Sequence, residues 1–274
     1  MVIRFWGVRG SVPSPGRHTC RYGGNTSCVS VEVGDRVLVL DAGTGVIQLG
    51  AALAGSGREV FFLLTHLHSD HIAGFPFFPL LYRSESPVHL LSYEKDGRPW
   101  SLMSLLDGYH FPLQAADVVA PVIRVDTDPL GYLADHGFSV ARLAVTHPGG
   151  AFGYRVTHGG RSLVFIPDHE LSPPPPVEAR QAEVVAFCRE ADVLVHDAQY
   201  LAAEMPARWG WGHSTLRQAC ELARAARVKH FIPFHHDPGR TDEALDAMQE
   251  QARALLEPHG IACTVAYEGL RVEL

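Results

Sequence analysis

Short apolar runs along this chain are each followed within two residues by a polar side chain suited to chemistry. Runs this short, and rich in β-branched or aromatic residues, are typical of buried strands. The strands predicted in this way are Arg36–Leu40 before Asp41, Val60–Leu64 before His66, Val140–Val145 before His147, Leu163–Ile166 before Asp168, Val193–Val195 before His196 and Asp197, and Phe231–Phe234 before His235. Because binding sites form where loops converge on a rigid sheet, we expect these polar side chains to meet at one edge of the fold.

Stretches with apolar residues at three- and four-residue steps lie between these runs and predict helices. The predicted helices are Val46–Ala54, Glu178–Glu190, Thr215–Arg227 and Asp242–Leu256. Thr215 and Gln218 have the spacing of a capping box, and Pro258 and Gly260 end the last helix. Two halves that are each strand-rich and then helical favour two sheets face to face with helices outside.

Two segments give weaker patterns. The four prolines Pro173–Pro176 predict a stiff, extended loop between layers rather than a domain boundary. Residues 82–135 show only short helical and loop patterns, which we interpret as a cap over the site. We therefore predict one domain over residues 1–274, a length that can bury a large core.

The charge balance bears on the partner. The formal net charge is −7, whereas proteins that hold long nucleic acid usually carry a basic face, because phosphate neutralisation supplies much of that affinity. A small ligand is therefore favoured over long nucleic acid. The 16 histidines, several of them clustered, are the more informative count, because they point to metal binding.

The sequence also gives expectations about compartment and redox state. No apolar run approaches the roughly 20 residues of a membrane span. The N-terminus lacks the apolar stretch of a signal peptide, so we expect a cytoplasmic protein without a membrane partner. The five cysteines form no CxxC pair, and we expect reduced thiols and no structural zinc.

The segment Thr65-His66-Leu67-His68-Ser69-Asp70-His71 carries four potential metal ligands in six positions, directly after a predicted strand. One ion cannot bind all four, but alternate side chains of a loop can serve two adjacent ions. Imidazole together with carboxylate suits zinc, manganese or iron better than calcium or magnesium. A histidine-rich surface loop is the alternative, and the buried strand before the segment argues against it.

This HxHxDH segment resembles the signature of the metallo-β-lactamase superfamily, and further pieces follow in the order of that family. Asp41 in Leu40-Asp41-Ala42-Gly43 resembles a carboxylate that supports the metal loop without binding metal. His147 before Pro148, Asp168 before His169, and His235 resemble the later ligands of the family. The resemblance covers essentially the whole chain and implies an α/β fold, a four-layer αββα sandwich.

The same resemblance implies two divalent metal ions, with zinc favoured and manganese or iron as alternatives. One ion would be bound by His66, His68 and His147, the other by Asp70, His71 and His235, and Asp168 would bridge the two. His236 lies next to His235 and could coordinate in its place, but His235 aligns with the family ligand.

His213-Ser214-Thr215 resembles the HST motif of ribonuclease Z and related phosphodiesterases, including the phosphoribosyl cyclic phosphodiesterases. The resemblance implies that His213 is a general acid paired with Asp197, where this branch more often has Glu. With Asp70, these two residues form the predicted catalytic set. The segments Phe5–Ser11 and Gly23–Ser27 also resemble bacterial members of the branch.

These parts fit phosphodiester hydrolysis. Two metals about 3.5–4 Å apart can hold a hydroxide that attacks phosphorus, and they can polarise the phosphoryl oxygens. His213, oriented by Asp197, would give a proton to the departing alkoxide. The helix that starts near Ser214 is expected to present backbone N–H groups to a phosphate oxygen.

Three aromatic residues and one arginine near the motifs could each contact the substrate or have only a structural role. Trp209, Trp211 and Tyr200 either stack on a base or pack under the loop that carries them. Arg9 either contacts phosphate or is an ordinary surface arginine.

The sequence thus predicts a metal-dependent hydrolase that cleaves a small or cyclic phosphodiester, such as a cyclic nucleotide. Ribonuclease Z carries a tRNA-clamping arm between the motifs that His147 and Asp168 represent, and this chain has only 20 residues there, 148–167. A ribonuclease Z-like nuclease is therefore the second choice. A non-catalytic metal-binding sensor is an alternative of another class, and a homodimer is compatible with every one of these functions.

Overall fold

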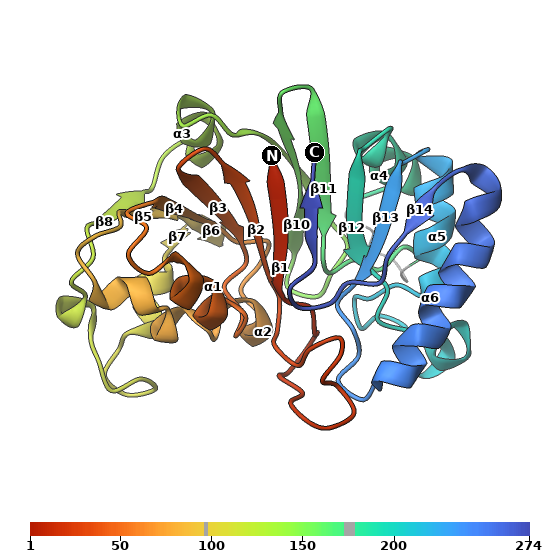
Figure 1. Ribbon diagram of the computed structural model, residues 1–274, viewed down its shortest axis with the longest axis horizontal. Coiled ribbons are helices and arrows are strands. Elements are labelled where there is room, and N and C mark those ends of the chain that lie inside the picture. The colour runs from red at the N-terminus through yellow and green to blue at the C-terminus, as the bar shows by residue number, and fades with distance from the viewer. Residues whose placement is uncertain (96–97, 173–178) are drawn as a thin grey trace.

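Two sheets pack face to face in the computed structural model, which describes residues 1–95, 98–172 and 179–274. The helices lie on the outside of the sheets: α1 (Val46–Leu53) and α2 (Ser69–Ile72) beside the first sheet, and α4 (Gln181–Cys188), α5 (Leu216–Ala225) and α6 (Asp242–Leu256) beside the second (Figure 1). A further helix, α3 (Pro129–Asp135), lies at the rim opposite α2. The predicted four-layer αββα arrangement is confirmed.

The first sheet has the strand order β15-β1-β2-β3-β4-β5-β8. Its strands are β1 (Val2–Gly7), β2 (Cys28–Val33), β3 (Arg36–Leu40), β4 (Glu59–Leu63), β5 (Val88–Leu91), β8 (Val122–Val125) and β15 (Arg271–Glu273). β3, β4, β5 and β8 run parallel to one another, so their carboxyl ends meet at one edge.

The second sheet has the order β14-β13-β12-β11-β10-β9. Its strands are β9 (Ser139–Val145), β10 (Ala151–His158), β11 (Arg161–Ile166), β12 (Val193–Asp197), β13 (His230–Phe234) and β14 (Ala262–Cys263). β11 to β14 are parallel, whereas β9 and β10 form an antiparallel meander with β11. All six strands predicted from short apolar runs are present, with bounds that differ by no more than three residues.

Three apolar layers hold the sandwich together. Between the sheets, Phe5 of β1 meets Phe234 of β13 with ring centroids 6.1 Å apart, and Phe165 of β11 packs on the same ring. Separate apolar clusters lie between each sheet and its outer helices. Because both faces of the central strands are buried, these strands read as continuous apolar runs, which is why the sequence predicts them.

The ends of the outer helices follow the sequence signals. The side chain of Thr215 accepts a hydrogen bond from the backbone N–H of Gln218, whose side chain accepts one from the N–H of Thr215, so the capping box is confirmed. After α6, Gly260 takes a left-handed conformation with φ 72° and ends the helical turn.

The interpretation of residues 82–135 as a cap is wrong. β5 and β8 extend the first sheet, and the described residues of β6 (Tyr93–Lys95) and β7 (Arg98–Trp100) form a separate two-stranded sheet. A cleft over the predicted metal ligands is lined by Ser11, His68, Ser69, Asp70, Asp168, His213 and His235, and none of the described residues of the segment is among them. The apolar run of β5 is short and interrupted by His89, which is buried against Phe61, so the strand signal is weak. Pro173–Pro176 lie outside the described residues.

Two smaller expectations concern the membrane and the thiols. In the parts of the chain that are described, no helix combines the length and the apolar character needed to cross a bilayer. All five cysteines are unpaired, and four of them are buried, which raises the pKa of each buried thiol and keeps it protonated.

Candidate metal centre

The metal-ligand loop begins where β4 ends. His66 is buried and lies outside regular secondary structure, and His68 is the exposed residue in extended backbone that precedes α2. The single turn of α2 then places Asp70 and His71 side by side and buries both. The change from extended to helical backbone within six residues lets the four side chains converge from two directions.

Three more side chains reach the same place from ends of strands in the second sheet. His147 follows β9, Asp168 follows β11 and His235 follows β13, and all three are buried. His236 points elsewhere, because its Nε2 hydrogen-bonds the carbonyl of Ala266 at 2.8 Å. The structure therefore brings His235, and not His236, to the cluster.

Asp168 lies between two groups of potential ligands. Its Oδ1 is 3.1 Å from Nε2 of His71 and 3.3 Å from Nε2 of His235. Its Oδ2 is 3.8 Å from Nε2 of His66 and 3.7 Å from Nε2 of His147. Each oxygen of one carboxylate thus faces a different pair of imidazoles, as a bridging ligand would.

The ligand atoms form two compact sets. Several overlapping groups of three such residues have ligand atoms within 4.8 Å of one another, and two of them match the predicted ion sites: His66 with His68 and His147, and Asp70 with His71 and His235. The second set is the more buried, because His68 is exposed in the first. The backbone N–H of Ser11 also donates to Asp70 Oδ2 at 2.6 Å, which fixes that carboxylate.

Three of the histidine rings have an outer nitrogen, Nδ1, that faces away from the cluster. The hydrogen bonds of these nitrogens test whether the residues fit a metal ion. Nδ1 of His71 donates to Asp41 at 2.7 Å, Nδ1 of His147 to the carbonyl of Gly212 at 2.9 Å, and Nδ1 of His235 to Oε1 of Gln199 at 2.8 Å. These acceptors hold a proton on Nδ1, so Nε2 of each ring presents a lone pair to the cluster.

In neutral rings of this tautomer, the inner nitrogens face one another without a proton between them. Nε2 of His71 and Nε2 of His235 are 3.3 Å apart, and Nε2 of His147 is 3.1 Å from Nδ1 of His68. Nε2 of His66 and Oδ1 of Asp168 are buried and lack a hydrogen-bond partner. Buried lone pairs that converge in this way are costly unless a cation lies among them, so the residues fit divalent metal with nitrogen and oxygen ligands.

Protonation states of three predicted ligands agree with metal binding, whereas His71 would have to give up a proton. Burial lowers the pKa of His66 well below its ordinary value and also lowers the pKa of His147, which keeps both rings neutral. Burial raises the pKa of Asp168, but the neighbouring His235 and His71 outweigh it and hold that pKa well below its ordinary value. Neutral imidazole and ionised carboxylate are the forms that bind metal. Burial lowers the pKa of His71, but nearby carboxylates outweigh it and raise that pKa well above its ordinary value, so metal binding would displace the proton.

Asp41 supports the loop from behind. It is fully buried with φ 63°, and it accepts hydrogen bonds from the backbone N–H of Thr65 at 2.8 Å and from Nδ1 of His71. The hydroxyl of Thr65 also donates to Asp41 and lies 3.1 Å from Nδ1 of His66. One carboxylate outside the cluster therefore orients ligands of both sets.

His213 and Asp197 form a close pair at the rim of the cluster. Nδ1 of His213 donates to Oδ2 of Asp197 at 2.7 Å, and Asp197 is held in turn by the backbone N–H groups of His169 and Gln199. Burial lowers the pKa of His213, but the Asp197 carboxylate outweighs it and raises the pKa to about 9. The Asp in place of the more frequent Glu therefore still reaches the ring.

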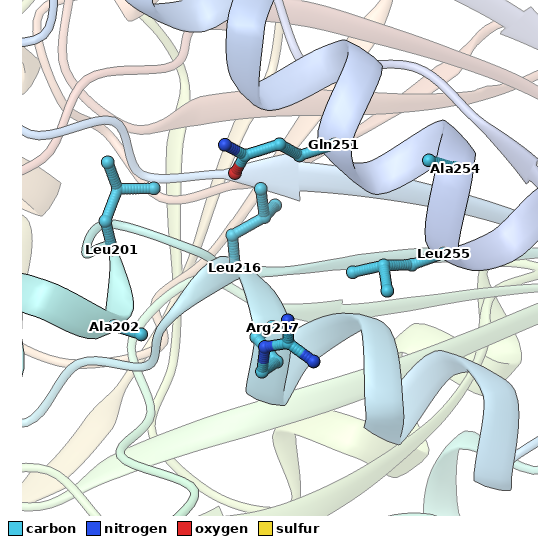
Figure 2. A pocket seen from close by; sticks show the side chains of 7 residues that line it. All are labelled: Leu201, Ala202, Leu216, Arg217, Gln251, Ala254 and Leu255. Carbon is cyan, nitrogen blue, oxygen red and sulfur yellow. The ribbon is translucent and has the colours of Figure 1, made fainter.

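A cleft of about 270 Å³ opens over these groups. It is lined by Ser11, His68, Ser69, Asp70, Asp168, His213 and His235. A larger cavity of about 470 Å³ lies elsewhere, between the start of α5 and the last turns of α6. Figure 2 shows its lining: apolar side chains including Leu201, Leu216 and Leu255, with Arg217 and Gln251 among them.

The start of α5 does not offer its N–H groups to the cleft, so that expectation is wrong. The N–H of Thr215 is used by Gln218 in the capping box, and the N–H of Leu216 donates to the carbonyl of Tyr200 at 2.9 Å. Leu216 and Arg217 instead line the larger cavity between α5 and α6, which we call the apolar groove. A strong capping box consumes the donors that an anion would need.

Arg9 is neither a surface residue nor part of the cleft lining. It is fully buried, and its guanidinium donates to the carbonyls of Gly23, Asp237 and Arg240 at 2.8, 3.2 and 2.6 Å. It therefore ties the N-terminal loop to the segment after β13. A fully buried arginine is rare, and nothing in the sequence around Arg9 signals it.

The three aromatic residues near the motifs differ in burial. Tyr200 is buried and meets the His213 ring edge-on at 5.6 Å, whereas Trp209 and Trp211 are exposed.

Two supporting residues were missed in the sequence analysis. Gln199 accepts a hydrogen bond from His235, and Glu170 accepts hydrogen bonds from the backbone of the loop before His213. Both partners are distant in sequence, so no local spacing identifies them.

Comparison with known proteins agrees with this geometry. Residues 36–236 match the sequence profile of the β-lactamase superfamily domain. Ribonuclease Z of Bradyrhizobium sp. is 28% identical over 94% of this chain and 96% of its own length. Ribonuclease Z of Pyrococcus horikoshii is 23% identical over 86% of each chain.

Solved structures share the fold over the whole chain. Zn²⁺-bound PqqB from Methylobacterium extorquens superposes with a TM-score of 0.67 at 20% identity, covering 100% of both chains. A diphosphatase of the PhnP family gives 0.64 at 21% identity over 100% of this chain and 97% of that one. Human tRNase Z, short form, gives 0.63 at 20% identity over 100% of this chain and 99% of that one. The family model covers more than half of the chain, which therefore belongs to the metallo-β-lactamase superfamily and is similar within it to ribonuclease Z and to a PhnP-family diphosphatase.

Proposed function

We propose that the protein is a dinuclear metal-dependent phosphodiesterase that hydrolyses small or cyclic phosphodiesters. The observation that carries the proposal is the position of Asp168, whose two carboxylate oxygens face two separate sets of ligand atoms. In this assignment His66, His68 and His147 hold one ion, Asp70, His71 and His235 hold the other, and Asp168 bridges them. Zinc is the favoured metal, because the donor set is mainly imidazole.

When bound, the two ions would activate water for attack on phosphorus and polarise the phosphoryl oxygens. The residues of the chain do the rest. Asp41, Gln199 and the carbonyl of Gly212 hold the ligand rings in one orientation, so the site is organised before substrate arrives. Ser11 fixes Asp70 from the rim of the cleft.

His213 is the proposed general acid. Its Nδ1 is bound to Asp197, which leaves Nε2 as the nitrogen available to substrate, and the residue lines the cleft beside Asp168. A protonated ring in this position would give its proton to the leaving oxygen as the phosphorus–oxygen bond breaks. Asp197 stabilises the charged ring and fixes its orientation.

Three observations support a small substrate. The cleft of about 270 Å³ is near the lower end of ligand pockets, roughly 300–1,000 Å³. The interval 148–167, which is described completely, consists of a short loop and the β10–β11 hairpin closed by Gly159 and Gly160, so it contains no inserted arm. The net charge of −7 also disfavours broad contact with RNA phosphates.

Processing of RNA is the second candidate, because the curated relatives named ribonuclease Z match most of this chain. Competition between substrate classes separates the two. Protein loaded with zinc would be given 2′,3′- and 3′,5′-cyclic nucleotides, a phosphoribosyl 1,2-cyclic phosphate and a 3′-extended tRNA, each at low and moderate salt. Preferential cleavage of the small diesters with weak salt dependence supports the proposal. Efficient, salt-sensitive trimming of the tRNA would favour the nuclease instead.

A further inference from the structure

Two exposed tryptophans lie on the loop that leads to His213. Trp209 is 62% exposed and Trp211 is 58% exposed. Trp211 is two residues from His213, so their Cα atoms are no more than about 7.6 Å apart. Large aromatic side chains left exposed beside a reactive site indicate an interaction surface, because burying them in the core would stabilise the fold.

The loop that carries the tryptophans is fixed by a buried carboxylate. Glu170 is 2% exposed, and its two oxygens accept hydrogen bonds from the backbone N–H groups of Gly210 at 3.0 Å and Gly212 at 2.9 Å. Nε1 of Trp209 donates to the carbonyl of Ser172 at 2.7 Å. Burying a carboxylate is costly unless it is hydrogen-bonded, so these contacts hold one loop conformation rather than several.

A line of ring contacts joins this loop to the proposed acid. The Arg208 guanidinium lies 5.6 Å from the ring centroid of Trp211 and 4.9 Å from that of Tyr200. Tyr200 in turn meets the ring of His213 edge-on at 5.6 Å. Asp237 holds Arg208 in place at 3.1 Å. The ring of Trp211 is therefore positioned relative to His213, and Trp209 is held beside it by its hydrogen bond to Ser172.

We propose that Trp209 and Trp211 determine specificity by stacking on the base of the leaving nucleoside, with Arg208 adding a cationic face. The inference rests on the proposed function: His213 gives its proton to the leaving oxygen, so the group attached to that oxygen lies beside the loop that precedes His213. An aromatic base fits two fixed indole faces. The substrate class is thus a phosphodiester whose departing alcohol belongs to a nucleoside.

Three substrates test the proposal with zinc-loaded, full-length protein. They are a dinucleoside monophosphate and its two abasic analogues, which lack the base on either the leaving or the retained nucleoside. We expect kcat/KM to fall roughly 5- to 150-fold when the leaving base is missing, the range for stacking one base on an aromatic side chain, and to change little when the retained base is missing. Equal rates on all three substrates would overturn the proposal.

Variants locate the effect. Trp209→Ala and Trp211→Ala should lose activity on the full dinucleotide and keep it on the analogue without the leaving base, and Trp211→Phe should restore most of it. Tyr109→Ala is the matched control, because Tyr109 is an aromatic residue that is 95% exposed and lies between β7 and β8 rather than on the loop before His213. An equal loss on all three substrates in the tryptophan variants would mean that they only support the loop, and it would contradict stacking.

A binding measurement tests the stacking surface without turnover. Adenosine monophosphate should quench the tryptophan fluorescence of the protein, ribose 5-phosphate should not, and the Trp209→Ala/Trp211→Ala double variant should lose the response. Quenching without cleavage of any diester would support the surface and contradict the phosphodiesterase. Cleavage without base-dependent quenching would contradict the surface and leave the phosphodiesterase standing.

Discussion

Two hollows in the described part of this molecule differ in size and in chemistry, and the smaller one holds the predicted reactive side chains. The groove of about 470 Å³ lies between helices, and it is lined mainly by apolar residues such as Leu216 and Leu255 (Figure 2). The cleft of about 270 Å³ lies where strands of both sheets end, and it is lined by ligand atoms and His213. Strand ends collect polar groups on a rigid frame, so chemistry, more than volume, identifies the site.

The largest effect should come from the ligand that the two sets share. Asp168→Ala should lower metal content and reduce turnover by about 10⁴-fold or more, because each ion supplies several kcal/mol of transition-state stabilisation and about 1.4 kcal/mol is tenfold in rate. Elemental analysis and steady-state kinetics measure both quantities. Full metal content in this variant would show that Asp168 is not the bridging ligand.

His213→Ala should keep the metals and lose rate. For a diester with an alkyl leaving group, loss of the general acid should cost about 10²–10⁴-fold. The cost should shrink for bis-p-nitrophenyl phosphate, because p-nitrophenolate leaves readily without a proton. A loss of equal size for both substrates would indicate that His213 positions substrate rather than protonating it.

Gln199→Ala tests how the ligand rings are held. Removing the acceptor for Nδ1 of His235 should weaken metal binding by about 10–100-fold, the usual effect of a partner behind a ligand. Competition with a chelator of known affinity measures the change. Unchanged affinity would show that the orientation of His235 is set by packing alone.

Asp197→Asn should change the pH profile. The carboxylate raises the pKa of His213 to about 9, so the acid form is present below that pKa and is lost as pH rises through it. Without the charge, the pKa falls, and the alkaline limb of kcat/KM should move to lower pH. Bound cations lower the pKa in both proteins, so the measurement is the difference between them. A limb that stays in place, or moves to higher pH, would exclude His213 as its origin.

Substitutions in the apolar groove between α5 and α6 should have the smallest effect on rate and metal content. Gln251→Ala and Leu255→Ala alter the lining of the larger cavity and lie outside the metal-ligand cleft. We expect kcat/KM for bis-p-nitrophenyl phosphate and the metal content to stay within about twofold of the unmodified protein, since surface changes away from a site are usually near neutral. A loss of rate with normal stability would show that the groove communicates with the cleft.

The clustering of the candidate ligands could be predicted from the sequence, because each group of them follows a short apolar run. The positions of His147, Asp168 and His235 depend on a local pattern, and parallel strands then bring them to one edge. The partners that hold them are not local. Gln199 reaches His235 from 36 residues away, and Glu170 reaches Gly212 from 42 residues away, which only the folded chain reveals.

The errors also have physical causes. Arg9 was expected at the surface or on phosphate because a buried guanidinium needs several acceptors, and its carbonyl acceptors come from three separate points of the chain. The N–H groups at the start of α5 were expected to face substrate, but the capping box that predicts the helix consumes them. In residues 82–135, His89 breaks the apolar run of β5 and hides the strand.

The most direct test of the account is the number of metal ions needed for activity. Protein stripped of metal with a chelator would be titrated with zinc while hydrolysis of bis-p-nitrophenyl phosphate is followed and bound zinc is measured. Because the ligand atoms form two sets that share Asp168, turnover should reach its plateau at two equivalents of zinc per chain. Full activity at one equivalent, with no further binding, would contradict the dinuclear site.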